Sequence, residues 1–343
     1  MIARWLFAGG HLRFGIAVLL LFTGTMPRPR SAAPSELRSR LIDLQRQSGL
    51  SLVTLYDNKI RAVSFADRKL KEVREVVKSG TALHGGISPD GTLLAFTFCS
   101  APGLQHPQQN ATICGGRDSV GIIGADGSGF REFLNLKYGA LPCWSYDNAR
   151  VADSWPDRSQ RRERIEGLKI VDLKSGHVEP VDGLDSFATG QCWSPDGKQI
   201  VYTMNKGGAI QTVRLYDTTL KKSHDLANGG NATWSPDGKW IAYLHCPPDL
   251  YHCEYDKIQA DGRERQRIFA VDVAFGGLIW SPDSKMVAYI GENLSGVDPP
   301  GPEQGPNELR VRVLDSGAED WVAHLGESDS PLFQWAKIGE MEH

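Results

Sequence analysis

The chain has 343 residues, of which 41% are hydrophobic, so it can bury a sizeable core as one large repeat fold or as two domains. Its 37 glycines and 19 prolines are spread along the sequence, which predicts many turns and little long helix. The formal net charge of −3 offers no basic surface for a phosphate backbone, so we expect no nucleic-acid partner.

The N-terminal segment, 1–33, has the features of an export signal. Arg4 and Arg13 give a positive start, a short apolar run follows at 14–22, and small residues at 31–33 suit a signal peptidase. The run is shorter than the about 18 apolar residues of a membrane span. Because Pro34 disfavours cleavage, an uncleaved anchor is the alternative. We therefore expect a periplasmic or secreted protein, which contacts a membrane only if this segment stays attached.

Residues 34–48 are expected to form a short amphipathic helix or linker. Leu37, Leu41 and Leu44 recur at helical spacing, and most residues between them are polar. The rest of the chain, 49–343, carries the internal repeats.

One phrase recurs along this part and predicts its architecture. It is clearest as CWSPDGKQIVYT, TWSPDGKWIAYL and IWSPDSKMVAYI, while GISPDGTLLAF, CWSYDNARVA and FQWAK are further copies. One position holds a large apolar residue in every copy: Ile87, Trp144, Trp193, Trp234, Trp280 and Trp335. The intervals between these positions fit a four-stranded propeller blade of about 40–50 residues with variable loops. We expect the indoles to be structural wedges between adjacent blades.

The phrase is typical of a tight turn between two strands. Ser-Pro-Asp-Gly suits a type I turn, because proline presets φ, aspartate suits the third position and glycine closes the fourth. The runs after it, such as IVYT and IAYL, are β-prone. Its aspartates are therefore interpreted as turn residues rather than as a ring of ligands: Asp90, Asp147, Asp196, Asp237 and Asp283.

A second series has the pattern of a hairpin and indicates the same number of blades. A β-prone run, a polar turn and a second run recur at 64–73, 122–133, 170–181, 214–226, 258–269 and 311–325. Because the first hairpin precedes the first inner strand, residues 330–336 are expected to complete its blade. The predicted fold class is all-β, a six-bladed β-propeller closed by pairing of its N- and C-terminal strands.

The WSPDGKxIAY phrase resembles the WD-type repeat of the TolB family and its relatives. The resemblance covers about residues 49–337 and implies a six-bladed propeller of the bacterial periplasm. TolB proteins carry an α/β domain ahead of the propeller, whereas only the short segment 34–48 separates the expected signal from the first strand here. The resemblance thus implies a TolB-like propeller rather than TolB itself.

Motifs of catalysis are missing from the sequence. There is no Gly-x-Ser-x-Gly nucleophile elbow, no His-Glu-x-x-His metal motif and no phosphate-binding glycine loop. We expect a monomeric binding protein without catalytic residues, cofactor or metal. His84 and His245 lie near inner strands, which leaves a lyase or lactonase in the central channel as the enzymatic alternative.

The six cysteines fit an oxidising compartment. Two pairs bracket loops and are expected to form disulfides: Cys99 with Cys114, and Cys246 with Cys253. Cys143 and Cys192 occupy equivalent positions of neighbouring blades, which predicts side chains that point the same way around the ring rather than at each other. A disulfide between them and two small buried thiols are the open alternatives.

The long insertions predict where a partner binds. They fall between the second and third strands, at 99–117, 155–167, 245–256 and 291–308, which places them on one face of the ring. Loops on a rigid scaffold concentrate binding residues, and arginine and aromatic side chains are enriched at interface hot spots. The candidate binding residues are Trp155, Arg158, Arg161, Arg162, Arg164, His106, Tyr251 and His252.

A solvated arginine loop, neutralised by Asp157, Glu163 and Glu166, is the alternative for the insertion at 155–167. The expected function is to bind and scaffold a protein of the cell envelope. An anionic glycan is the second candidate ligand, which would make the protein a carbohydrate-binding propeller.

Overall fold

The computed structural model describes residues 34–100, 103–105, 112–114, 118–133, 143–157, 164–181, 187–205, 211–247, 253–271, 275–291, 308–325 and 333–337. Residues Ser31–His343 form one compact unit. The expected export signal at 1–33 lies outside the described residues.

The helix α1 (Pro34–Ser48) leads into the first strand. Leu37 and Leu41 are buried in a cluster with side chains of β1, β23 and β24 (described below), and Leu44 packs at the edge of the same cluster, as the leucine spacing predicts. Glu36 in the first turn and Arg46 in the last complement the helix dipole. Within the described residues, no helix has the length and apolar character to cross a membrane.

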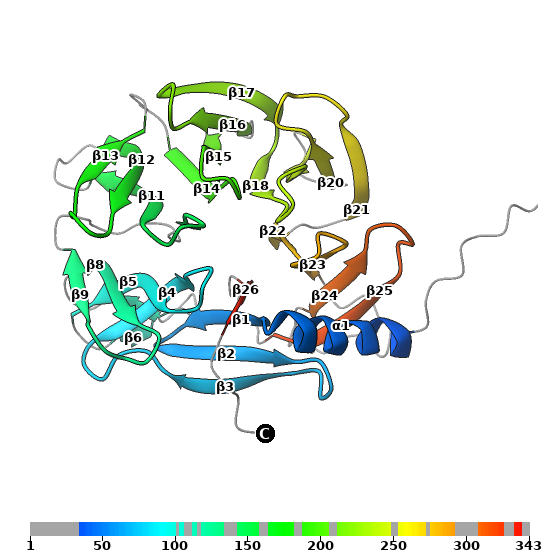
Figure 1. Ribbon diagram of the computed structural model, residues 1–343, viewed down its shortest axis with the longest axis horizontal. Coiled ribbons are helices and arrows are strands. Elements are labelled where there is room, and N and C mark those ends of the chain that lie inside the picture. The colour runs from blue at the N-terminus through cyan, green and yellow to red at the C-terminus, as the bar shows by residue number, and fades with distance from the viewer. Residues whose placement is uncertain are drawn as a thin grey trace, which may run out of the picture. The chain divides into compact units, whose positions relative to one another are not determined.

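Apart from β6 and β7, the described strands divide into six groups of four, called blades here, that follow one another in chain order (Figure 1). Strands β1 and β4 also pair, from Leu55↔Gly85 to Tyr56↔His84, and so join the first two groups into one eight-stranded sheet. Blade 1 combines β26 (Phe333–Ala336) with β1 (Ser51–Tyr56), β2 (Lys59–Ser64) and β3 (Lys69–Glu75). Blade 2 contains β4 (Thr81–Ile87), β5 (Leu93–Cys99), β8 (Asp118–Gly124) and β9 (Arg131–Phe133). Blade 3 contains β10 (Cys143–Trp144), β11 (Arg150–Asp157), β12 (Arg164–Asp172) and β13 (Val178–Pro180).

The last three blades repeat this antiparallel order. Blade 4 contains β14 (Phe187–Trp193), β15 (Gln199–Asn205), β16 (Gln211–Asp217) and β17 (Lys222–Asn228). Blade 5 contains β18 (Gly230–Trp234), β19 (Ile241–His245), β20 (Cys253–Ile258) and β21 (Gln266–Val271). Blade 6 contains β22 (Phe275–Trp280), β23 (Met286–Gly291), β24 (Glu308–Val313) and β25 (Glu319–His324). A separate pair, β6 (Gly103–Gln105) and β7 (Thr112–Cys114), follows β5.

The core lies in the seams between neighbouring blades. Among the described residues, the buried hydrophobic side chains form six clusters, and each draws on two adjacent blades. Trp193 of blade 4, for example, lies with Leu168 and Ile170 of blade 3 and is fully buried. The equivalent residue fills every other seam, with Ile87 and Trp335 in the two seams of blade 1. The interpretation of these residues as wedges is therefore confirmed.

Each Ser-x-Asp turn between a first and second strand is held by the same three hydrogen bonds. In the turn of blade 4, the Ser194 hydroxyl donates to Asp196 Oδ1 at 2.6 Å and accepts from the Gln199 N–H at 2.9 Å. Asp196 Oδ1 also accepts from the Lys198 N–H at 3.1 Å. The serine is buried in all five copies: Ser88, Ser145, Ser194, Ser235 and Ser281. Because a buried hydroxyl must find partners, this turn needs both the serine and the aspartate.

Strands from the two ends of the unit pair with each other, as expected. β26 pairs with β1 in antiparallel register from Ser51↔Ala336 to Thr54↔Phe333. The Gln334 amide also donates to the Ile87 carbonyl of blade 2 at 2.8 Å. A strand from the C-terminal part of the chain thus covers an edge of β1 that would otherwise be open.

We predict that ending the chain at residue 328 costs far more stability than the loss of so short a segment suggests. The deletion removes β26, whose Phe333 and Ala336 are buried, and exposes the edge of β1. Losing one buried phenylalanine alone costs about 3–5 kcal/mol. Urea unfolding of this variant and of a control ending at residue 338 measures the difference; equal free energies of unfolding would contradict the role of β26.

Ser194→Ala is predicted to lower the free energy of unfolding by about 1–3 kcal/mol, because it leaves the Gln199 N–H without the buried Ser194 hydroxyl that accepts its hydrogen bond. Ser175→Ala is the matched control: its hydroxyl also donates to an aspartate, Asp172, at 2.6 Å, but in an exposed turn. We expect the control to change stability by less than about 0.5 kcal/mol. Equal losses in the two variants would show that burial of the turn serine is unimportant.

Candidate functional site

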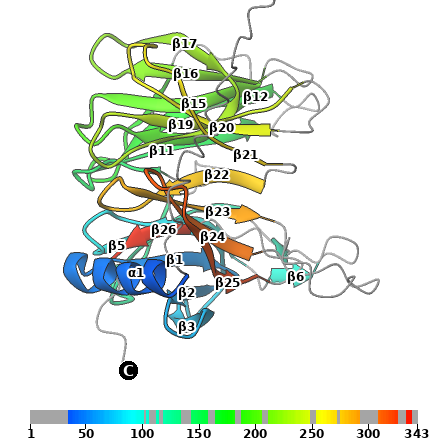
Figure 2. The same ribbon diagram turned by 90° about the vertical axis from the view of Figure 1, so that its right-hand side faces the viewer.

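The two ends of the blades differ because of the way the strands are connected. The first and second strands are joined at one end by the turns 88–92, 145–149, 194–198, 235–240 and 281–285, which we call the turn face. The second and third strands are joined at the opposite end, which we call the loop face. The strand ends that border it pair as Cys99↔Asp118, Asp157↔Arg164, Asn205↔Gln211, His245↔Glu254 and Gly291↔Glu308. Figure 2 shows β6 at the right, on the loop face of blade 2.

Two of the eight candidate binding residues lie on described strands that border the loop face. Trp155 lies in β11, and Arg164 is the first residue of β12. These are the longest described strands, with 8 and 9 residues, and they pair as far as Asp157↔Arg164 after a bulge at Ser154/Pro156. The six other candidates lie outside the described residues: His106, Arg158, Arg161, Arg162, Tyr251 and His252.

Covalent and polar contacts hold the strand ends at the loop face. Cys246 and Cys253 form the expected disulfide, which joins the residue after β19 to the first residue of β20. Cys99, the last residue of β5, is also disulfide-bonded, whereas the side chain of Cys114 is outside the described residues, so their pairing stays a prediction. The His245 ring nitrogen lies 3.2 Å from the Asn228 carbonyl, an ordinary structural contact.

A network of charged residues on blade 6 was not recognised from the sequence. Glu308 is buried at the loop-face end of β24 and binds Arg310 at 2.7 Å. Arg310 also binds Glu319 at 2.8 Å, and Glu319 binds Arg312 at 3.0 Å. Burial alone would raise the pKa of Glu319, but hydrogen bonds from Tyr289, Arg310 and Arg312 outweigh it and lower that pKa. These ion pairs link β24 and β25, the two outer strands of the blade.

The aspartates of the turn face are engaged within their own turns, which confirms their interpretation as turn residues. Each accepts the hydroxyl of the serine two positions before it. Lys198 and Lys239 lie 3.8 Å from the aspartates of their own turns. Within the part of the chain that the structure describes, no three His, Cys, Asp or Glu side chains are grouped so that they could hold a metal ion.

The expectation that Cys143 and Cys192 do not point at each other was wrong. Their sulfur atoms lie 3.1 Å apart, and both residues are thiols. The two residues stand two positions before the serine of their turns, on the first strands of blades 3 and 4, and these strands are in contact. Because first strands of neighbouring blades converge, side chains with the same direction still meet.

No protein-family model and no curated protein matches the chain. Among solved structures it is similar to TolB from Acinetobacter baumannii, over 88% of this chain and 72% of that one, with 15% identity and a TM-score of 0.56. A TolB candidate from Agrobacterium tumefaciens matches over 81% and 90%, with 17% identity and a TM-score of 0.50.

Similar structures also include an oligogalacturonate lyase in complex with manganese, with 70% of each chain covered, 13% identity and a TM-score of 0.52. A chain of a nidogen/laminin complex matches over 84% of this chain and 99% of its own, with 8% identity and a TM-score of 0.56. At these identities the likeness concerns the fold. The sheets, the seams and these neighbours together show that the chain has the fold of a TolB-like six-bladed β-propeller.

Proposed function

We propose that this protein is an exported propeller that binds a protein partner of the cell envelope through its loop face and does not catalyse a reaction. The observation that carries the proposal is that disulfides hold the strand ends that border this face. In blade 5 the disulfide Cys246–Cys253 closes the base of the connection between β19 and β20. In blade 2 the disulfide-bonded Cys99 stands at the end of β5, where the corresponding connection begins.

Fixing the base of a binding loop favours association. A loop that is already ordered loses less conformational entropy when a partner binds, so more of the contact energy appears as affinity. At the loop-face end of blade 2, Ser119 is buried and its hydroxyl donates to Glu132 at 2.7 Å. At the same end of blade 6, Glu308 binds Arg310. A disulfide or a buried polar contact therefore stands beside the connection in three blades.

The arginine segment of blade 3 is the proposed centre of the binding surface. The segment comprises Arg158, Arg161, Arg162 and Arg164, and in the sequence it follows β11, whose last residue pairs with the first residue of β12 as Asp157↔Arg164. Its arginines would bind carboxylates of the partner in bidentate geometry, which favours an acidic protein surface. The neighbouring Trp155 would add an aromatic anchor of the type found at interface hot spots.

The cysteines support export. A disulfide that closes a seven-residue separation, Cys246–Cys253, persists in an oxidising compartment and is rare in the cytosol. The similar structures include TolB and a chain of a nidogen/laminin complex, and the second is an assembly of proteins, which agrees with a protein-binding role.

An anionic carbohydrate is the second candidate ligand, because two similar structures are oligogalacturonate lyases. Arginines recognise the carboxylates of such a sugar by the same chemistry as an acidic protein. If the purified protein degraded oligogalacturonate, measured by the absorbance of unsaturated products, the non-enzymatic proposal would be overturned. Binding without turnover would replace the protein partner with the glycan.

The quadruple variant R158A/R161A/R162A/R164A is predicted to lose its partner in a cross-linking pull-down from envelope extract. The matched control K174A/K198A/K239A/K285A removes the same number of positive charges from exposed positions at the opposite end of the blades. We expect the control to capture the same proteins as the wild type, identified by mass spectrometry. An unchanged set of partners for the arginine variant would remove this segment from the binding surface.

Expressed with its own N-terminus in a bacterium, the protein is predicted to reach the periplasm or the membrane that faces it. Mass spectrometry without reduction should then show Cys99 linked to Cys114 and Cys246 linked to Cys253. A cytoplasmic protein with six thiols would contradict both the export and the disulfides.

A further inference from the structure

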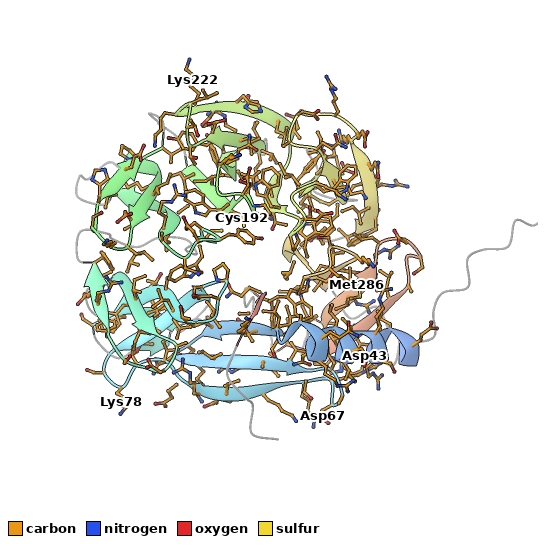
Figure 3. All side chains as sticks on the ribbon, viewed as in Figure 1. Asp43, Asp67, Lys78, Cys192, Lys222 and Met286 are labelled. Atoms are coloured by element: carbon orange, nitrogen blue, oxygen red, sulfur yellow. A yellow bond between two sulfur atoms is a disulfide. The ribbon has the colours of Figure 1, made fainter. Side chains whose placement is uncertain are left out.

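Two thiols face each other on the inner strands of neighbouring blades. Cys143 lies on β10 and Cys192 on β14, and Cys143 Sγ donates a hydrogen bond to Cys192 Sγ across 3.1 Å. Figure 3 shows Cys192 on the side of its blade that is nearer the centre of the unit. A disulfide bond has a sulfur–sulfur distance of about 2.05 Å, so the sulfur atoms need to move by about 1 Å to bond.

The surroundings of the two thiols differ, and they favour the thiolate at Cys192. The pKa of the Cys192 thiol is lowered, first by the hydrogen bond from Cys143. Burial opposes this effect, but the backbone of Trp234, the Thr233 hydroxyl and the backbone of Trp193 lower the pKa further. Since the thiolate is the nucleophile in disulfide exchange, the lowered pKa favours Cys192 as the attacking sulfur and Cys143 as the resolving one.

Neither cysteine is fully buried: Cys143 packs at the edge of the cluster between blades 3 and 4, and Cys192 at the edge of the cluster between blades 4 and 5. Tyr146 stands in the turn that follows β10, where the other turns of this kind have proline, and its side chain is exposed. The pKa of Tyr146 is raised, first by burial and then by the charges of Cys192 and Cys143, so its hydroxyl stays protonated.

We propose that Cys143 and Cys192 are a reversible dithiol–disulfide pair that exchanges with low-molecular-weight disulfides and, when oxidised, joins blades 3 and 4 covalently at their inner strands. The Cys192 thiolate attacks one sulfur of the external disulfide, a mixed disulfide forms, and one thiolate leaves. Cys143 then loses its proton and attacks Cys192 Sγ, so the mixed disulfide breaks and the second thiolate leaves. Two protein thiols are oxidised, and one external disulfide is reduced to two thiols.

The bond would brace the seam between blades 3 and 4. This seam buries Trp193 between the two blades, and Arg150 of blade 3 lies 4.4 Å from the indole ring. The two cysteines are 49 residues apart in sequence, so the bond closes a long loop in the unfolded chain and removes conformational entropy from it. The oxidised form is therefore the more stable one.

The test equilibrates the full-length protein in buffers of oxidised and reduced glutathione, followed by alkylation, digestion and mass spectrometry. We expect a peptide linked through Cys143 and Cys192 that forms and disappears reversibly, while Cys246–Cys253 stays linked throughout. We also expect the oxidised wild type to melt roughly 5–10 °C above the reduced protein. If no peptide linked through Cys143 and Cys192 is found in buffers that keep Cys246–Cys253 oxidised, the proposed pair is overturned. If the oxidised and reduced proteins have the same Tm, the proposed stabilisation of the seam is overturned.

Two single variants assign the roles of the sulfur atoms. Cys143→Ser lacks the resolving thiol, so it should accumulate a stable mixed disulfide with glutathione at Cys192. Cys192→Ser should capture glutathione at least about tenfold more slowly. Equal capture rates would overturn the assignment of Cys192 as the attacking sulfur. Because the linked peptide is measured on the wild type, the proposal stays testable even if a variant fails to fold.

Discussion

In every seam of this propeller, one large side chain from a first strand lies among buried residues of the preceding blade. A four-stranded sheet has two faces, and neither can be left in water without losing the burial that stabilises the blade. Each blade therefore depends on the blades before and after it. Strand β26 meets this requirement for blade 1, since Phe333 and Trp335 pack against blade 6 and Gln334 binds blade 2.

Adjacent residues of the repeated phrase fill the seam between two blades and form the turn beside it. Trp193 and Ser194 are neighbours in sequence, so strand alternation sends the indole into the seam while the hydroxyl stays under the turn. The turn uses the aspartate and serine for its own hydrogen bonds. The opposite end carries the disulfide Cys246–Cys253, the buried Glu308 and Arg164 at the start of β12, and these features support our proposal that the partner binds there.

The two kinds of cysteine chemistry serve different purposes. Cys246 and Cys253 are seven residues apart, and their bond holds a single connection in place. Cys143 and Cys192 come from different blades, so a bond between them would act on a seam of the core. Oxidation of this pair would strengthen the contact between blades 3 and 4. The hairpin formed by β11 and β12 belongs to blade 3.

The sequence by itself determined the number of blades, the wedge residues, the turns, the helix at 34–48 and the pairing of the terminal strands, because each follows from local patterns repeated at one spacing. Only the tertiary structure decided that Cys143 and Cys192 meet. Their equivalent positions in the repeat indicate the direction of their side chains, but not how close the inner strands of neighbouring blades come to each other. The tertiary structure also decided that Glu308, Arg310 and Glu319 form ion pairs, because the register between β24 and β25 brings these residues together. Local periodicity fixes which way a residue points, but only the packed sheets decide what it meets.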